Sequence, residues 1–223
     1  YNYIGVSKLL TEWASKKLGL KKNQIYLLPN IRDIKPVAIN QEKDKSIKEQ
    51  SINLVHVSNI HPIKHIEFSI QILYELRKKR EAKLTVYGQI TDKHYFQSLV
   101  LLSEKLNLKE DLVFIHDQLN IPSILHKYDL GSCTSKSESG PLVLIEYLSR
   151  ELPFVSYNTG EVLRQIGNQY PLFIIDSFEK KIWVERILDI FDNSSNHKKS
   201  LINIFNQYFS DKSYFNSLMA IYQ

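Results

Sequence analysis

Two glutamates, eight residues apart, mark the part of the sequence with the clearest capacity for chemistry. Glu138 comes just before the turn Ser139-Gly140-Pro141, and Glu146 lies in the apolar run that follows. A proline at this position favours a helix that begins at the turn. Because a helix start offers free N–H groups and a partial positive charge, it suits a diphosphate, and Glu146 would reach a hydroxyl pair beside that phosphate.

The same glutamates also have a purely structural interpretation. In that alternative, Glu138 only caps the helix and Glu146 is an exposed surface residue. The residue types and their spacing favour neither alternative over the other.

Other catalytic motifs are absent from the sequence. It contains no G-x-x-x-x-G-K-S/T loop, no G-x-G-x-x-G after a strand, no H-E-x-x-H and no G-x-S-x-G. His61 and His65 have helical spacing, but Pro62 falls between them and no third ligand is near. We therefore expect no metal site. The lone Cys133 also excludes a disulfide framework and a cysteine-based zinc site, and it fits a reducing compartment.

The apolar pattern predicts the scaffold that positions these residues. Short, continuous apolar runs alternate with helical segments, which is typical of parallel strands buried on both faces. We therefore predict an α/β fold with a doubly wound, mostly parallel, six-stranded Rossmann-like sheet and a helical C-terminus from Phe178 onward. The predicted strands are Ile52–Ser58, Lys83–Tyr87, Leu112–His116, Asp129–Thr134, Phe154–Tyr157 and Leu172–Ile175.

Helices are predicted between these strands, and their connections define where a site belongs. Such sheets bind ligands at the carboxyl ends of their strands, so we expect the loops that follow the strands to form the site. Before the sheet, the sequence predicts a helix over Val6–Leu20, a short strand over Ile25–Leu28 and a polar linker over Arg32–Gln50. The later predicted helices are Lys64–Arg80, Asp92–Leu106, Ile121–Lys127, Pro141–Arg150 and Glu161–Ile166.

The overall composition is that of an ordinary globular protein. It is 43% hydrophobic and 24% charged, which argues against disorder and low complexity. The net charge of +5 comes from short basic clusters with acids nearby, which we interpret as solvated helix faces. An anionic membrane surface is the second alternative, and a nucleic acid is not expected as a partner. No apolar run is long enough for a membrane-spanning helix.

A family resemblance links these observations. The stretch from Glu138 to Glu146 resembles the E-x7-E motif of retaining GT-B glycosyltransferases of family 4, the large group-1 family. Neighbouring segments resemble the same family in order and spacing, over nearly the whole chain. They are Ile25–Asp33 (the interdomain stretch), Val57–Lys64 (the Gly-Arg-x4-Lys loop), Lys83–Gly88, Val113–Gln118, Leu152–Val155 and Thr159–Glu161.

The resemblance implies a role for each matched residue. Glu138 would hold hydroxyls of the donor sugar near the anomeric carbon, and Glu146 would bind the ribose hydroxyls. Lys64 would neutralise the departing diphosphate without a metal, since the D-x-D signature of the other main glycosyltransferase fold is missing. The remaining nucleotide-sugar contacts would be Asn59 and Gly88, the backbone near Gln118 and Asn120 at the base, and Ser139, Gly140, Pro141, Leu142 and Val143 at the helix start.

Three positions depart from the family's pattern. Asn59 stands where the family has a phosphate-binding arginine, and Ser58 stands where a glycine precedes it. Asparagine donates hydrogen bonds without a charge, so the leaving group has one cation less. We interpret this as subgroup variation rather than inactivation. Ser139 in place of glycine after the first glutamate is a mild change.

The resemblance also implies a domain organisation. Residues 1–50 would be the end of an N-terminal domain and the interdomain linker, 51–195 the nucleotide-sugar-binding Rossmann-like domain, and 196–223 the C-terminal helices. The acceptor-binding half would then lie outside this sequence, and the only methionine, Met219, also leads us to expect a piece of a longer protein. Aromatic side chains of the last helices would either form an exposed apolar patch or, as we prefer, pack on the domain's own sheet. They are Phe205, Tyr208, Phe209 and Tyr214.

The implied function is sugar transfer, with retention, from a nucleoside-diphosphate sugar to a glycan or lipid-linked acceptor in bacterial surface polysaccharide synthesis. We expect a UDP-sugar as the donor and no cofactor. The protein would be cytoplasmic, with peripheral association at the inner face of the membrane as an option. Two alternatives stay open: a non-catalytic nucleotide-binding half that pairs with a separate acceptor subunit, and a GT-B sugar-nucleotide epimerase.

Overall fold

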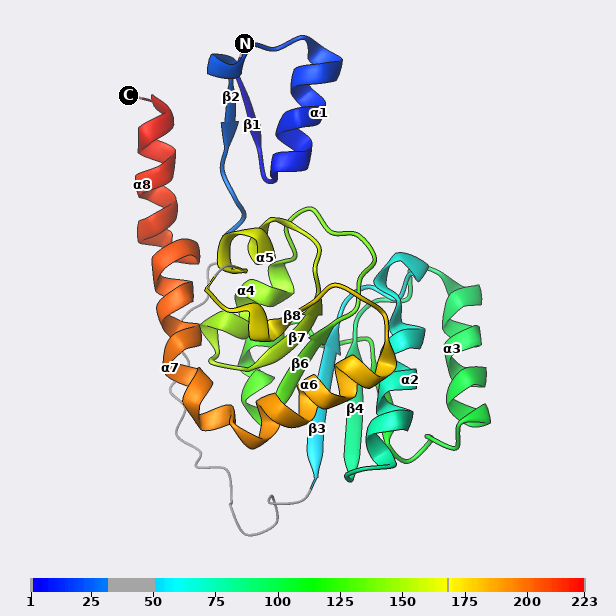
Figure 1. Ribbon diagram of the computed structural model, residues 1–223. Helices are drawn as coiled ribbons and strands as arrows, with labels where there is room; N and C mark the ends of the chain where they lie inside the picture. Colours follow the sequence, from blue (N-terminus) through cyan, green and yellow to red (C-terminus); the bar gives the residue numbers. More distant parts are fainter. Residues whose placement is uncertain (1, 32–50, 168, 223) are drawn as a thin grey trace.

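A parallel sheet of six strands lies at the centre of the computed structural model, which describes residues 2–31, 51–167 and 169–222 (Figure 1). The predicted linker Arg32–Gln50 lies outside the described residues. The strand order is β5-β4-β3-β6-β7-β8, and every neighbouring pair is parallel, which confirms the predicted α/β fold. The strands are β3 (Ile52–Val57), β4 (Ala82–Tyr87), β5 (Leu112–Ile115), β6 (Leu130–Cys133), β7 (Phe154–Tyr157) and β8 (Ile174–Ile175).

The order of the strands creates a switch point between β3 and β6. From β3 the chain moves outward through β4 to β5, then returns to the other side of β3 and moves outward again through β6, β7 and β8. Because parallel crossovers are right-handed, the helices after β3 and β6 lie on opposite faces of the sheet. Their connections therefore separate at this point and leave a crevice at the carboxyl ends of the two strands.

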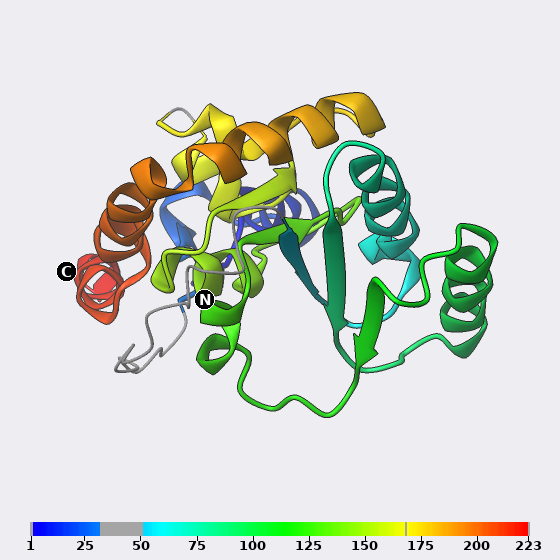
Figure 2. The same ribbon diagram turned by 90° about the horizontal axis from the view of Figure 1, so that it is seen from below.

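Helices cover both faces of the sheet. Helix α2 (Ile66–Arg77) packs against α3 (Lys93–Lys105) and α6 (Lys180–Asp192), whereas α4 (Leu142–Ser149) packs against α7 (Ser194–Ile204). Figure 2 shows α6 crossing the molecule on one side of the strands. The predicted helix Lys64–Arg80 begins two residues later than expected, because Pro62–Lys64 form a separate 3-10 turn. The remaining α-helix between the described sheet strands is α5 (Glu161–Ile166). The predicted helix Ile121–Lys127 is instead two 3-10 turns, Ile121–Ser123 and Leu125–Lys127.

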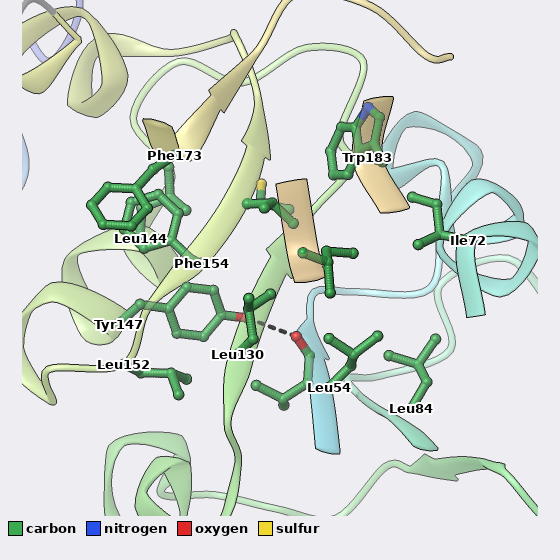
Figure 3. Close-up of a cluster of buried hydrophobic side chains, with 14 of the residues drawn as sticks. Leu54, Ile72, Leu84, Leu130, Leu144, Tyr147, Leu152, Phe154, Phe173 and Trp183 are labelled. Carbon is green, nitrogen blue, oxygen red and sulfur yellow. Dashed lines mark hydrogen bonds between the residues drawn. The ribbon is translucent and has the colours of Figure 1, made fainter. Parts of the chain in front are cut away.

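Helix α4 is fixed against the sheet by a close contact between a glycine and a tyrosine. A Cβ atom on Gly131 of β6 would lie 2.5 Å from the ring of Tyr147 in α4. This approach lets the buried Tyr147 hydroxyl donate to the carbonyl of Val55 in β3, at 3.4 Å (Figure 3). The contact determines how α4, whose first residues follow the turn at Pro141, sits above the switch point.

Replacing Gly131 with alanine is expected to destabilise the protein by about 1–3 kcal/mol, because the added methyl group overlaps the Tyr147 ring and forces repacking. Urea unfolding measures the loss. The double variant Gly131→Ala with Tyr147→Leu should lose less than the sum of the two single variants, since the smaller side chain makes room. Strict additivity of the two changes would contradict this account of the contact.

A small unit precedes the sheet. Strand β1 (Tyr3–Gly5), helix α1 (Lys8–Leu18) and strand β2 (Ile25–Leu27) form a βαβ unit in which the two strands pair in parallel. It lies beyond the carboxyl ends of the sheet strands (Figure 1). Among the described residues, two hydrogen bonds join it to the sheet domain: the Lys8 N–H donates to Glu161 at 2.8 Å, and the Asn30 amide donates to the Gly140 carbonyl at 3.0 Å. The helix and β2 agree with the prediction, whereas β1 was not predicted.

The C-terminal helices pack partly on the sheet domain. After α7 come a π-helical turn (Phe205–Phe209) and α8 (Asp211–Tyr222). Phe209 is buried, and Phe205 and Tyr208 pack against the core, as we preferred. Tyr214, the fourth of these side chains, lies half-buried in α8 and does not belong to the core. Further along, α8 exposes Phe215, Met219 and Tyr222. Within the three described ranges, no helix combines the length and the apolar character that a membrane span requires.

Candidate functional site

A cavity of about 260 Å³ lies at the carboxyl ends of β3 and β6, at the switch point of the sheet. Its wall combines the end of β3, the loop after β3, the end of β6 and the start of α4. Six of the predicted site residues line it: Lys64, Glu138, Gly140, Pro141, Leu142 and Val143. The other lining residues are His56, Val57, Ser58, Cys133 and Ser135.

A cation and a carboxylate meet in this cavity. The Lys64 ammonium donates to Oε1 of Glu138 at 2.6 Å, and their side chains keep only 23% and 15% of their exposure. Lys64 ends the 3-10 turn after β3, and the left-handed His65, with φ of 53°, then turns the chain sharply into α2. Glu138 comes from the loop after β6. The site therefore holds a positive and a negative group that a ligand can separate or bridge.

The start of α4 supplies a third feature. Pro141 occupies the N-cap position, and no side chain caps this helix start. Glu138 pairs with Lys64 instead, so the structural alternative in which Glu138 caps the helix is wrong. The Leu142 and Val143 positions lie at the positive end of the helix dipole and line the cavity. An anion in the cavity would meet this helix end and the Lys64 ammonium together.

Glu146 is buried in the second turn of α4. Only 5% of its surface is exposed, so the alternative that it is merely a surface residue is also wrong. It is not among the residues that line the cavity. Its role at the ribose stays a prediction.

The other predicted site residues lie outside the cavity wall. Asn59 and Asn120 are exposed, and the Gln118 amide donates to the Asn120 carbonyl at 3.2 Å in the loop after β5. Ser139 is exposed as well. At Gly88 a Cβ atom would lie 1.8 Å from the Ser58 carbonyl oxygen, so this glycine lets the end of β4 approach the loop after β3.

Sequence reasoning missed a buried histidine in the wall of the cavity. His56 is 1% exposed, and its ring nitrogens contact Ser58 Oγ at 2.9 Å and Ser69 Oγ at 3.0 Å. Burial, together with the charge of Lys64, lowers the pKa of His56 to about 3, so the ring is neutral at physiological pH. The available signal was a histidine within the otherwise apolar run Leu54-Val-His-Val57.

The low pKa of His56 predicts a loss of stability in acid. Between pH 6.5 and about 3, His56 binds a proton in the unfolded chain but not in the folded protein. The free energy of unfolding therefore falls as the pH falls. From pH 7 to pH 5 this group alone should remove about 2 kcal/mol. Denaturant unfolding of the protein and of His56→Gln at both pH values isolates this share. Equal losses in the two proteins would contradict the assignment.

Comparison with known proteins supplies a family and a set of related folds. Residues 38–206 match the family described as Glycosyl transferases group 1. Among curated proteins, N-acetyl-alpha-D-glucosaminyl L-malate synthase of Bacillus anthracis is 26% identical over 121 residues, which is 54% of this chain and 31% of that protein. The chain thus spans less than a third of the length of that relative.

Solved structures of similar fold are longer too. A glycosyltransferase from Rickettsia africae superposes with a TM-score of 0.83 at 14% identity, covering 99% of this chain and 62% of that one. TarM has a TM-score of 0.81 at 15% identity, covering 100% and 43%. HepE of Anabaena, in complex with UDP, has a TM-score of 0.79 at 16% identity, covering 97% and 62%. At these identities the likeness shows the fold alone.

Proposed function

The chain belongs to the group 1 glycosyl transferases, and we propose that it is the half of a retaining, GT-B glycosyltransferase that binds the nucleoside-diphosphate sugar. The observation that carries this proposal is the cavity in which Lys64, Glu138 and the start of α4 meet. A diphosphate needs positive charge, and a sugar needs hydrogen-bond acceptors for its hydroxyl groups. This cavity offers both, at the switch point where open α/β sheets bind ligands.

The diphosphate would bind at the Lys64 side of the cavity. Its oxygens would take the place of Glu138 beside the ammonium and would accept hydrogen bonds at the start of α4. As the bond to the sugar breaks, charge develops on the leaving diphosphate, and these preorganised groups would stabilise it. Lys64 and the helix end would thus do what a metal ion does in other enzymes.

The sugar would bind beside Glu138. A carboxylate near the anomeric carbon accepts hydrogen bonds from sugar hydroxyls and favours the positive character that the ring gains in the transition state. Glu146, Asn59 and Gly88 would bind the ribose and phosphates, and the backbone near Gln118 and Asn120 would bind the base. The HepE and TarM complexes contain UDP, which supports a UDP-sugar as the donor.

The acceptor would bind largely outside this chain. The chain spans 43% of TarM and 62% of HepE, so we propose that the rest of a longer protein supplies the acceptor site and that this chain alone binds donor without transferring sugar. WaaG is named as an enzyme of lipopolysaccharide biosynthesis, which supports a glycan or lipid-linked acceptor in bacterial surface polysaccharide synthesis. Such an enzyme would act in the cytoplasm, at the inner face of the membrane.

A hydroxy acid is the second candidate acceptor. The Bacillus anthracis relative is named N-acetyl-alpha-D-glucosaminyl L-malate synthase, a name that joins an N-acetylglucosaminyl group to L-malate. Transfer assays with the longer protein, UDP-N-acetylglucosamine and either L-malate or a lipid-linked glycan decide between the two. Binding without transfer to any acceptor would favour the non-catalytic half, and conversion of the sugar nucleotide without acceptor would favour an epimerase.

Calorimetric titration of this chain tests the proposal directly. UDP, GDP and ADP are titrated first, and UDP-glucose and UDP-N-acetylglucosamine follow. We expect one nucleotide to bind and its sugar conjugate to compete for the same site. Failure of every nucleotide and nucleotide sugar to bind would refute the proposed function.

Nucleotide binding should not depend on a divalent metal. Because Lys64 and the start of α4 balance the diphosphate charge, an excess of EDTA is expected to leave the dissociation constant of UDP unchanged within about twofold. The matched titration adds magnesium chloride. Loss of UDP binding in EDTA, restored by magnesium, would show that the phosphate site is assigned incorrectly.

A further inference from the structure

A chain of buried hydrogen bonds runs beneath the candidate cavity and ends at it. Its centre is the ring of His56 at the end of β3, which contacts Ser58 at one nitrogen and Ser69 of α2 at the other. Ser69 in turn contacts Thr134, which follows β6, at 3.0 Å. Thr134 contacts the carbonyl oxygens of Lys64 and His65 at 3.0 and 2.9 Å.

The two carbonyl groups determine which group donates and which accepts in each of these hydrogen bonds. A carbonyl oxygen can only accept a hydrogen bond, so the Thr134 hydroxyl must donate its proton to the carbonyl oxygens of Lys64 and His65. The Thr134 oxygen then accepts a hydrogen bond from Ser69, so the Ser69 hydroxyl donates its proton to Thr134. The Ser69 oxygen is left to accept, and the group that donates to it is Nδ1–H of His56.

A second set of contacts gives the same assignment. Ser132 donates its proton to the Val55 carbonyl at 3.4 Å, so its oxygen also acts as an acceptor toward Nδ1 of His56, at 3.5 Å. The neutral ring carries one proton, and both contacts place it on Nδ1. Nε2 is therefore bare. Its partner at 2.9 Å, the Ser58 hydroxyl, must donate to it.

We propose that Ser58 accepts a hydrogen bond from a hydroxyl of the donor sugar, and that His56 is the positioning residue that makes Ser58 an acceptor. Because the Ser58 hydroxyl donates its proton to His56, the Ser58 oxygen can only accept a hydrogen bond from a group in the cavity, which Ser58 lines. A phosphate oxygen has no proton to donate at neutral pH, whereas a sugar hydroxyl has one. The inference rests on the proposed function and names Ser58 as a sugar-specificity residue.

The proposal divides the cavity into two chemical halves. Lys64 and the start of α4 donate, which suits the diphosphate, whereas Ser58 and Glu138 accept, which suits the sugar. Sequence comparison alone gave Ser58 no role, because the position is a glycine in the family's usual pattern. A glycine there has no hydroxyl, so the acceptor is a feature of this chain's own residues.

Histidine NMR tests the proton directions without any ligand. Long-range ¹H–¹⁵N correlation spectra of the ¹⁵N-histidine-labelled chain, with His56 assigned by its absence in His56→Gln, should show a proton on Nδ1 and none on Nε2. The pattern should persist from pH 8 to pH 5, since the pKa of the ring is about 3. In Ser69→Ala the preference for Nδ1 should weaken. A proton on Nε2 in the unsubstituted chain would overturn the proposal.

Binding experiments test the partner of Ser58. Ser58→Ala should lower the affinity for UDP-glucose or UDP-N-acetylglucosamine, whichever binds, by about 2- to 10-fold, as expected for one neutral hydrogen bond. The affinity for UDP should change by less than about twofold. Ser58→Thr keeps the hydroxyl and should retain affinity. Ser137→Ala, an exposed serine outside the cavity wall, is the control and should change neither ligand.

The outcomes separate the two proposals. If Ser58→Ala lowered the affinity for UDP as much as or more than the affinity for the UDP-sugar, Ser58 would donate to phosphate. That result would overturn the inference. If the unsubstituted chain bound no nucleotide sugar, the proposed function would fail and the sugar would no longer be the partner of Ser58. The NMR spectrum would still decide the polarity of Ser58 by itself.

Discussion

Replacing Lys64 with methionine is expected to weaken UDP binding by about 100-fold. The substitution keeps the apolar stem but removes the ammonium, and a charge-assisted hydrogen bond contributes roughly 1.5–3 kcal/mol. The effect should lie at the upper end of that range, because Glu138 then stays in the cavity without its cation. An incoming diphosphate would meet a carboxylate instead of an ammonium. Calorimetric titration of UDP measures the change.

Lys136 provides the matched control for this experiment. It lies on the loop after β6, pairs with Glu67 at 3.8 Å, is half exposed and does not line the cavity. Lys136→Met removes the same charge nearby and should change UDP affinity by less than about threefold, the scale of an exposed ion pair. Adding Glu138→Gln to Lys64→Met should restore part of the lost affinity. Similar losses in the two lysine variants would show that Lys64 contributes only to the overall charge.

Replacing Glu138 with glutamine is expected to separate binding from catalysis. In the longer enzyme, kcat should fall by about 100- to 1,000-fold, the usual scale for one preorganised electrostatic group at a transition state. Affinity for UDP should rise slightly, because the substitution frees the Lys64 ammonium from its present partner. Affinity for the UDP-sugar should fall relative to UDP. Steady-state kinetics and calorimetry on the same variant measure these effects.

Glu146 distinguishes this division of labour from a general loss of structure. If Glu146 binds ribose, Glu146→Gln lowers the affinities for UDP and for the UDP-sugar by a similar factor, whereas Glu138→Gln lowers the affinity for the UDP-sugar relative to that for UDP. Glu138 lies in the loop that leads into α4 and Glu146 lies within α4, so a simple disturbance of this loop and helix would act alike in both variants. Parallel losses of UDP and UDP-sugar in both variants would refute separate roles.

The central sheet was predictable because its strands carry their signal locally. The runs that form β3 to β7 are largely apolar, although β4 alternates with Lys83 and Thr85. Because helical segments separate these runs, the pattern favours a parallel α/β sheet. Strand β1 has only three residues, Tyr3–Gly5, which give no period, and it forms because it pairs with Ile25–Leu27. The strand order is likewise not local, since it depends on which faces the crossover helices occupy.

The candidate site was predictable only where single segments carry motifs. Lys64 and Glu138 were expected from separate motifs, but their direct pairing was not, because they are 74 residues apart in the sequence. The same limit applies to His56: a histidine in an apolar strand suggests a buried polar contact without naming its partners. Ser69 lies in α2 and Thr134 directly follows β6, so only the fold brings them to the ring.

Each of the two hydrogen bonds that join the N-terminal βαβ unit to the sheet domain depends on the side chain of one partner and on the backbone of the other. In each, one partner is a backbone group: the N–H of Lys8 and the carbonyl of Gly140. Every residue except proline supplies a backbone N–H, so a substitution at position 8 leaves that bond intact. At position 140, by contrast, a Cβ atom would lie 2.9 Å from the Asn30 amide nitrogen, so the second bond depends on the glycine. Within the described residues, these two hydrogen bonds therefore depend on Glu161, Asn30 and Gly140. A lineage that kept these three residues would keep both hydrogen bonds between the unit and the sheet domain beside the cavity.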